Sequence, residues 1–230
     1  MYTTIPETKA RNLKEIEKPA VSVTVLIFSI NKGKLEIVLV KRVRTPFMDF
    51  LSIPGDIISI DQDLEDAARK VLSDKTGIHD VYLEQLYTFG DPRRDPRGRV
   101  LTVAYFALLP HNSVDLSKAP DALHASFVSV DGLPKLAFDH NQIVDYGVER
   151  VKGKIEYSNI AHGLLPEKFR LSELQKIYEI ILGKNLDKRN FRKKIAALNL
   201  VEPTKEVYRE GNHRPATLYK FKSKDLVIYD

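Results

Sequence analysis

Arginines gather in one short stretch of the chain, residues 89–100 (FGDPRRDPRGRV), where Arg93, Arg94, Arg97 and Arg99 stand among prolines and glycines. A guanidinium presents a planar fork of N–H donors, which suits the paired oxygens of a phosphate or diphosphate. Asp-Pro and Arg-Gly are also ordinary turn signals, and an exposed basic loop needs no ligand. The pattern therefore predicts either a phosphate clamp or a solvated loop.

Further side chains could complete such a clamp. Lys41, Arg42 and Arg44 follow the end of a predicted strand in the same half of the chain. Tyr105 and Phe106 are neighbours on another predicted strand, where successive side chains point to opposite faces, so only one of them can face a pocket. Either ring could stack on a base, although packing in the core is the simpler interpretation of Phe106.

A second group of basic residues is expected on a helix near the C-terminus. Residues 171–182 (LSELQKIYEIIL) have apolar side chains at helical spacing, with Ser172 as the predicted N-cap and Gly183 as the stop. Asp187 is expected to cap a second helix, in which Phe191, Ile195 and Leu198 face inward. The outward face carries Lys188, Arg189, Arg192 and Lys193. Two short helices in this order match a helix-turn-helix.

The last segment has the pattern of a wing. Residues 200–203 open a strand that returns as residues 216–221 (ATLYKF), with residues 211–215 as the tip between them. Arg209, His213 and Arg214 at this tip could reach phosphates or the minor groove of DNA. A solvated basic hairpin is the alternative.

Charge and composition agree with two functional halves. Residues 1–145 carry 18 Lys/Arg against 20 Asp/Glu, a net charge of −2, whereas residues 146–230 carry 18 against 11, a net charge of +7. A basic part beside an acidic part is expected of a nucleic-acid binder, although a solvated basic face would show the same balance. The absence of Cys excludes disulfides, thiolate metal sites and thiol nucleophiles. The six His are scattered without ligand spacing, so we expect neither a metal site nor a cofactor.

The elements that must position these residues can be read from periodicity. We expect a loose arm over residues 1–18 and a hairpin of two central strands. Further strands, a motif helix and a second helix follow. The second helix is expected to start at Asp139, with His140 partly packed, and residues 154–170 look like a linker. The predicted strands are residues 22–28, 35–40, 81–88, 99–108 and 125–130, and the second helix is residues 139–150. No apolar run approaches a membrane span and the N-terminus has no signal-peptide core, so we expect a cytoplasmic protein.

Residues 56–78 (DIISIDQDLEDAARKVLSDKTGI) resemble a Nudix box whose chemistry has been removed. The pattern is Gly, five residues, Glu, seven residues, then Arg-Glu-apolar-X-Glu-Glu-X-Gly-apolar. As structure the segment predicts an amphipathic helix with Asp63 as N-cap and Gly77 as C-cap. Asp56 replaces the first Gly and Gln62 the first Glu, while Lys70, Val71, Asp74 and Lys75 replace the Arg and the later glutamates. Because those glutamates hold Mg²⁺ in hydrolases, we expect no enzyme activity.

Together these segments resemble the Nudix-related transcriptional regulators. The degenerate box, the arginine loop, the LAFDH sequence at residues 136–140, the helix pair and the HRPATLYKF wing occur in one order along the chain. The resemblance implies an α+β fold, with a Nudix-like α/β/α sandwich over residues 19–150 and a winged helix-turn-helix over residues 151–230. It also implies a homodimeric repressor of operator DNA that senses ADP-ribose, often in control of NAD metabolism, or a sugar in some relatives.

Two sets of site residues follow from the motifs and the resemblance. Candidate effector-binding residues are Arg42, Arg44, Arg97, Arg99 and Phe106. Candidate DNA-binding residues are Lys188, Arg189, Asn190, Arg192, Lys193, Arg209, His213 and Arg214. Two alternatives remain: a Nudix hydrolase of ADP-ribose or a related nucleoside diphosphate, and a winged helix used for protein contacts.

Overall fold

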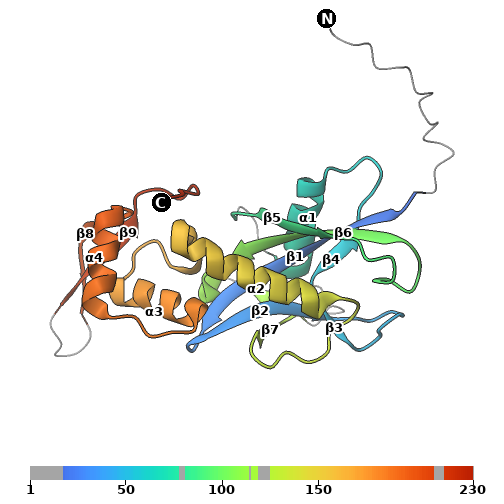
Figure 1. Ribbon diagram of the computed structural model, residues 1–230, viewed down its shortest axis with the longest axis horizontal. Coiled ribbons are helices and arrows are strands. Elements are labelled where there is room, and N and C mark those ends of the chain that lie inside the picture. The colour runs from blue at the N-terminus through green and yellow to red at the C-terminus, as the bar shows by residue number, and fades with distance from the viewer. Residues whose placement is uncertain (1–17, 78–80, 114, 119–124, 210–214, 230) are drawn as a thin grey trace, which may run out of the picture.

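The computed structural model describes residues 18–77, 81–113, 115–118, 125–209 and 215–229 (Figure 1). It contains a mixed sheet at one end, a small helical domain with a two-stranded wing at the other, and a long helix that crosses the front of the sheet. In the described part of the chain, no helix is both long and apolar enough to cross a membrane.

The sheet is built around the predicted hairpin. The strands β1 (Ala20–Asn31) and β2 (Lys34–Lys41) pair antiparallel through a tight turn at Lys32 and Gly33, whose φ angles of 46° and 80° suit a two-residue hairpin loop. The strand β6 (Val100–Leu108) runs parallel to β1, and β5 (Glu84–Phe89) closes that edge. The short strands are β3 (Leu51–Ser52), β4 (Gly55–Ile57) and β7 (Ser126–Ser129).

Helices cover both faces of the sheet, which confirms the predicted sandwich. Along β1, Val23 and Val25 join one core layer under α1 (Leu64–Thr76), whereas Leu26 and Phe28 join the other layer under α2 (His140–Tyr157). The cap predictions for α1 are confirmed. Asp63 accepts a hydrogen bond from the Glu65 N–H at 2.8 Å, and Gly77 ends the helix in the left-handed conformation with φ 69°.

The helix α2 lies close against the sheet because Gly147 has no side chain. A Cβ at this position would lie 2.6 Å from Cδ2 of Leu26, closer than real carbon atoms approach. The helix runs to Tyr157, beyond the end predicted at residue 150, so the proposed domain boundary falls inside it.

The prediction of a linker over residues 154–170 was wrong. The segment continues α2 and then forms a 3-10 helix at Ile160–Leu164. Ser158 and Asn159, which look like loop residues in sequence, are buried. The Asn159 side chain accepts a hydrogen bond from Val227 N–H at 2.8 Å and donates one to Asp225 O at 2.9 Å. These partners are distant in sequence and satisfy polar side-chain groups that the local sequence alone predicts to be exposed to solvent.

The C-terminal part is a winged helix, as predicted. The helices α3 (Leu171–Leu182) and α4 (Lys188–Leu198) precede the antiparallel strands β8 (Val201–Tyr208) and β9 (Ala216–Phe221). Gly183 ends α3 with φ 65°, but the predicted N-cap was wrong: Arg170 occupies that position, and Ser172 lies within the first turn. The Glu173 carboxylate accepts from the Arg170 N–H at 2.7 Å and so takes over the capping role.

Candidate effector pocket and nucleic-acid interface

A pocket of about 630 Å³ opens where β1, β2 and β4 meet the start of α2. Three of the predicted effector-binding residues, Arg42, Arg44 and Arg97, line it. The lining also includes Ser22, Thr24, Ser52 and the acidic residue Asp56. The structure therefore brings together arginines that lie more than fifty residues apart in the chain.

Phe138 organises the basic side of this pocket. The guanidinium carbon of Arg42 lies 4.6 Å from the centre of the Phe138 ring, and that of Arg97 lies 5.6 Å from it. An arginine that stacks through its face keeps its N–H edges free for hydrogen bonds. Burial, and then the nearby positive charge of Arg97, lowers the pKa of Arg42 from its ordinary value. Two cations at one ring favour an anionic ligand between them.

Asp95 balances only part of this charge. Its carboxylate accepts hydrogen bonds from Arg97 Nε at 3.0 Å and Nη2 at 2.7 Å. Burial by itself would raise the pKa of Asp95, but the hydrogen bonds from Arg97 outweigh it and lower the pKa. The Asp95 carboxylate thus pairs with Arg97. The Nε of Arg42 instead donates to the uncharged Pro46 carbonyl at 3.0 Å. The pocket keeps a net positive charge.

Arg94 also lines the pocket, but its guanidinium has a structural role. Its guanidinium is buried and donates to both oxygens of Asp139, at 2.9 Å and 2.8 Å. Asp139 holds the N-cap position of α2 as predicted, but its side chain makes no cap hydrogen bond because Arg94 takes both of its oxygens. This buried pair fastens the arginine loop to the start of α2.

Two predicted effector-binding residues lie elsewhere. Arg99 donates to the Gly90 carbonyl at 2.7 Å and is not part of the described pocket lining. Phe106 is fully buried in the core layer under α2, so its ring has no surface on which a base could stack. Sequence reasoning missed Phe138, the aromatic side chain that does line the pocket. The signal was its place in the LAFDH segment, directly before a predicted helix start.

The helix of the degenerate Nudix box carries no metal-binding face in its described part. Val71, which stands where the pattern has Glu, is 4% exposed and packs in the apolar layer between α1 and the sheet. Lys70 pairs with Asp74, the acid that remains at the glutamate positions of the motif. Among the described residues, no group of three or more His, Asp or Glu side chains is placed to hold a metal ion.

The second candidate site is α4. Asp187 caps this helix, as predicted, by accepting from Asn190 N–H at 2.8 Å. Phe191 and Ile195 are buried, and the Phe191 ring packs edge-on against Tyr178 of α3 at 5.3 Å. The opposite face exposes every predicted DNA-binding residue of the helix: Lys188, Arg189, Asn190, Arg192 and Lys193. Within the described structure, no ion pair involves the four cations of this face, Lys188, Arg189, Arg192 and Lys193.

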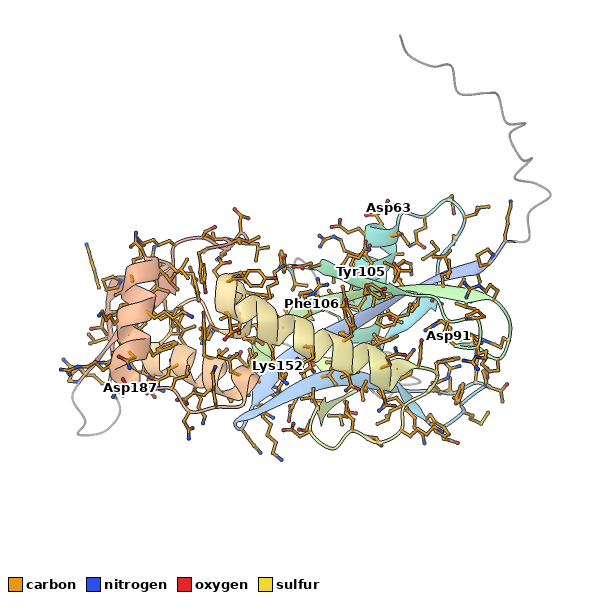
Figure 2. The ribbon with its side chains drawn as sticks, viewed as in Figure 1. Asp63, Asp91, Tyr105, Phe106, Lys152 and Asp187 are labelled. Carbon is orange, nitrogen blue, oxygen red and sulfur yellow. The ribbon has the colours of Figure 1, made fainter. Side chains whose placement is uncertain are left out.

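The wing extends the same end of the molecule. Arg209 follows β8 and is exposed, whereas His213 and Arg214 lie outside the described residues. Figure 2 shows Asp187, at the start of α4, far from Asp91, which lies in the arginine loop beside the pocket. The two candidate sites thus occupy opposite ends of the protein, with α2 between them.

A sensor-like pocket in a Nudix sandwich, joined to a winged helix with a free basic face, defines the class of ligand-responsive DNA-binding regulators. Residues 18–146 match the Nudix domain family, and residues 161–221 match the family described as the NrtR DNA-binding winged helix domain. The chain belongs to the NrtR family of Nudix-related transcriptional regulators.

Individual relatives agree with this assignment. The chain is 37% identical over 211 residues to the ADPR responsive transcriptional repressor NtrR of Acinetobacter baylyi, covering 90% of this chain and 84% of the relative. It superposes on Shewanella oneidensis NrtR complexed with a 27mer DNA with a TM-score of 0.79 and 32% identity, covering 88% and 93% of the two chains. The NUDIX domain of that protein complexed with ADP ribose matches with a TM-score of 0.54 and 29% identity, over 62% and 94%.

A more distant relative has an enzyme's name. The ADP-ribose pyrophosphatase of Methanocaldococcus jannaschii is 34% identical over 142 residues, which are 60% of this chain and 80% of the relative.

Proposed function

We propose that this protein is a transcriptional repressor whose winged helix binds operator DNA and whose Nudix domain binds ADP-ribose as an effector. The observation that carries the proposal is the pairing of an arginine-lined pocket at one end with an unpaired basic helix at the other. A regulator of this kind acts where its operator is, so we place it in the cytoplasm.

The DNA-binding part of the proposal rests on α4. A recognition helix contacts base edges in the major groove through residues near its N-terminus. Arg189, Asn190 and Lys193 are exposed there, and arginine, asparagine and lysine are side chains suited to base-edge contacts. Lys188, Arg192 and Arg209 would then contact phosphates and supply salt-dependent affinity. We include His213 and Arg214 as wing contacts on the family resemblance alone.

The effector part rests on the charge and shape of the pocket. Arg42, Arg44 and Arg97 suit a diphosphate, and the carboxylate of Asp56, which also lines the pocket, suits the hydroxyl groups of a sugar. The volume of about 630 Å³ is in the usual range for small-molecule sites. ADP-ribose is the ligand in the names of the relatives, and it combines a diphosphate with two riboses.

Hydrolysis of the ligand is the second candidate function, favoured by the relative named as a pyrophosphatase. Two observations argue against it, because a Nudix hydrolase needs several carboxylates around Mg²⁺. Val71 is buried where the pattern has a glutamate, and Asp74, the acid that remains at the glutamate positions, is paired with Lys70. We therefore propose that the Nudix domain binds its ligand without cleaving it.

The connecting helix suggests how ligand and DNA affect each other. The N-terminal end of α2 lies at the pocket, and the chain after its C-terminal end packs into the winged helix. We propose a homodimer in which a bound effector changes the relative orientation of the two winged helices through α2. The effector must bind the two arrangements with different affinities, because equal affinity shifts no equilibrium.

Fluorescence anisotropy tests the whole proposal in one titration. Labelled DNA from upstream of the gene and its neighbours is titrated with protein at fixed salt, and ADP-ribose is then added. We expect tight binding that ADP-ribose alters, and no AMP released in the presence of Mg²⁺. Binding that is indifferent to ADP-ribose would keep the DNA-binding role and exclude this effector, whereas no DNA binding at low salt would contradict the regulator.

A matched pair of variants locates the DNA interface. The double substitution Arg189→Ala/Lys193→Ala is expected to weaken binding by at least about tenfold and to reduce the slope of log affinity against log salt by up to about 2. Lys135→Ala removes an exposed cation of the Nudix domain and should leave both quantities unchanged. Equal effects of the two changes would show that binding depends on net charge and not on α4.

A further inference from the structure

His140 is the first residue of α2 and lines the effector pocket, yet the residue is only 5% exposed. Its Nδ1 accepts a hydrogen bond from the backbone N–H of Ile53 at 2.9 Å. A neutral imidazole has one acceptor nitrogen and one donor nitrogen, so this bond places the proton on Nε2. The backbone N–H of Ile53 therefore sets the tautomer of the ring.

The other nitrogen of the ring is left without a protein partner. Nε2 has no hydrogen bond to any residue that the structure describes. It is also not among the described side-chain atoms that are sealed from solvent without a partner, so it keeps some accessible surface, and the residue lines the pocket. A nearly buried N–H donor that faces an open pocket is incomplete until a ligand or water accepts from it.

The surroundings of His140 indicate what such a ligand offers. Its ring centre lies 5.4 Å from that of Phe138, on which Arg42 and Arg97 stack. The N-terminal end of a helix adds a partial positive charge at the same place. Two guanidinium groups, an imidazole N–H and the N-terminal end of α2 therefore lie around one space. The complementary ligand is an anion with several acceptor oxygens.

The imidazole remains an uncharged donor in this setting. Burial, assisted by the positive charges of Arg94 and Arg42, lowers the pKa of His140 to about 3. A protonated ring would also lose the hydrogen bond from Ile53 N–H. The group therefore donates from Nε2 throughout the physiological pH range.

We propose that His140 binds the effector directly, by donating a hydrogen bond from Nε2 to a phosphate oxygen of its diphosphate. The inference rests on the proposed function and extends it, because it adds a binding residue that belongs to the first turn of α2. A ligand held by His140 contacts the helix that leads to the winged helix. The ligand would thus contact α2 directly, and α2 is the element that we expect to transmit ligand binding to the winged helix.

Two substitutions separate this role from a structural one. In His140→Asn the amide oxygen can replace Nδ1 as the acceptor for Ile53 N–H, but no donor reaches the position of Nε2. In His140→Gln the longer amide places an N–H₂ donor near the position of Nε2. If His140 binds the diphosphate, His140→Asn should bind ADP-ribose about tenfold more weakly or worse, and His140→Gln should bind within about threefold of the wild type.

Isothermal titration calorimetry of the full-length wild type and both variants measures these affinities, with inorganic pyrophosphate as the minimal probe beside ADP-ribose. Thermal melting checks that each variant is folded. Equal affinity of the wild type and a folded His140→Asn would overturn the inference and leave the proposed function standing. A His140→Gln variant as weak as His140→Asn, although folded, would also overturn it. No binding of either probe to the wild type would overturn the inference together with the effector part of the proposed function, and would leave its DNA-binding part standing.

Discussion

Phe138 has a φ of 55°, in the left-handed region that non-glycine residues seldom adopt. Its neighbours on both sides hold it there: Ala137 N–H donates to Leu51 O at 2.9 Å, and Asp139 accepts two hydrogen bonds from the buried Arg94. Residues in such sparsely populated conformations often occur at functional sites. Here the conformation places an aromatic ring beside both guanidiniums of the proposed diphosphate site.

Arg97 should therefore contribute much more to ligand binding than its neighbours in the same loop. Arg97→Gln removes a charged donor from the pocket and is expected to weaken ADP-ribose binding by about 10- to 100-fold. Arg93 has a side chain that is 91% exposed and lies outside the described pocket lining, so Arg93→Gln should change the affinity by less than about threefold. Calorimetric titration of both variants decides the point, and similar losses in the two would refute the assignment.

His140 predicts a pH dependence of stability. In the unfolded chain the imidazole titrates near its ordinary value of 6.5, whereas burial and the nearby cations lower its pKa to about 3 in the folded protein. As the pH falls below about 6.5, the unfolded state takes up the proton first, so the free energy of unfolding decreases, by up to about 1.4 kcal/mol for each pH unit. Urea unfolding from pH 7 to pH 4 measures this slope.

The matched control for that slope is His140→Asn, which has no titrating ring but can keep the hydrogen bond from Ile53. Arg94, Arg42 and Asp139 surround the position and remain in both proteins. We expect the stability of the wild type to fall more steeply with decreasing pH than that of the variant. Parallel curves would mean that His140 is protonated in the folded state near its ordinary pKa.

At the scale of elements, α1 forms the helix expected of a Nudix box but lacks most of its glutamates. Val71→Glu would restore one acid of the pattern, but it would place a carboxylate in the packed layer between α1 and the sheet. We expect a loss of roughly 2–4 kcal/mol in the free energy of unfolding, measured by urea denaturation, and no release of AMP from ADP-ribose with Mg²⁺.

The control on the same helix is Lys70→Glu, which changes an exposed position and should cost far less stability. A Val71→Glu variant as stable as Lys70→Glu would show that position 71 tolerates a carboxylate. Measurable hydrolysis by either variant would mean that the box is closer to an active site than its geometry indicates.

For the whole molecule, one core cluster runs from the sheet through the 3-10 helix into both helices of the winged helix. It includes Phe28 of β1, Ile160, Ile177 of α3 and Phe191 of α4. The buried Lys154 near the end of α2 also pairs with Glu84 of β5. The two domains therefore share an apolar core, and the ion pair fastens the end of α2 to the sheet.

Because of this shared core we expect the protein to unfold in one cooperative transition. Differential scanning calorimetry should show a single peak with equal calorimetric and van't Hoff enthalpies per cooperative unit. Ile177→Ala in α3, which should cost about 2–5 kcal/mol, is expected to lower the melting temperature of that single peak. Two separate peaks, of which only one moves in the variant, would instead show independent domains.

The sequence by itself determined the parts of this protein that depend on neighbouring residues. The hairpin at Lys32 and Gly33, the caps at Asp63 and Asp187 and the stop at Gly183 are local events, governed by turn and cap chemistry within a few residues. Hydrophobic periodicity likewise predicted the strands and helices, and motif order identified the family. Small errors remained at element ends, as at β5, which begins at Glu84 and not at residue 81.

Only the tertiary structure decided which side chains meet. Arg42, Arg97 and Phe138 come from three distant segments, and Arg94 finds Asp139 forty-five residues away. Nothing in the local pattern of the arginine loop separates Arg97 from Arg94, whose guanidinium is held by Asp139, or from Arg99, which lies outside the described pocket lining. These outcomes depend on packing of the loop against α2 and the sheet, and long-range packing leaves no periodic signal in one sequence.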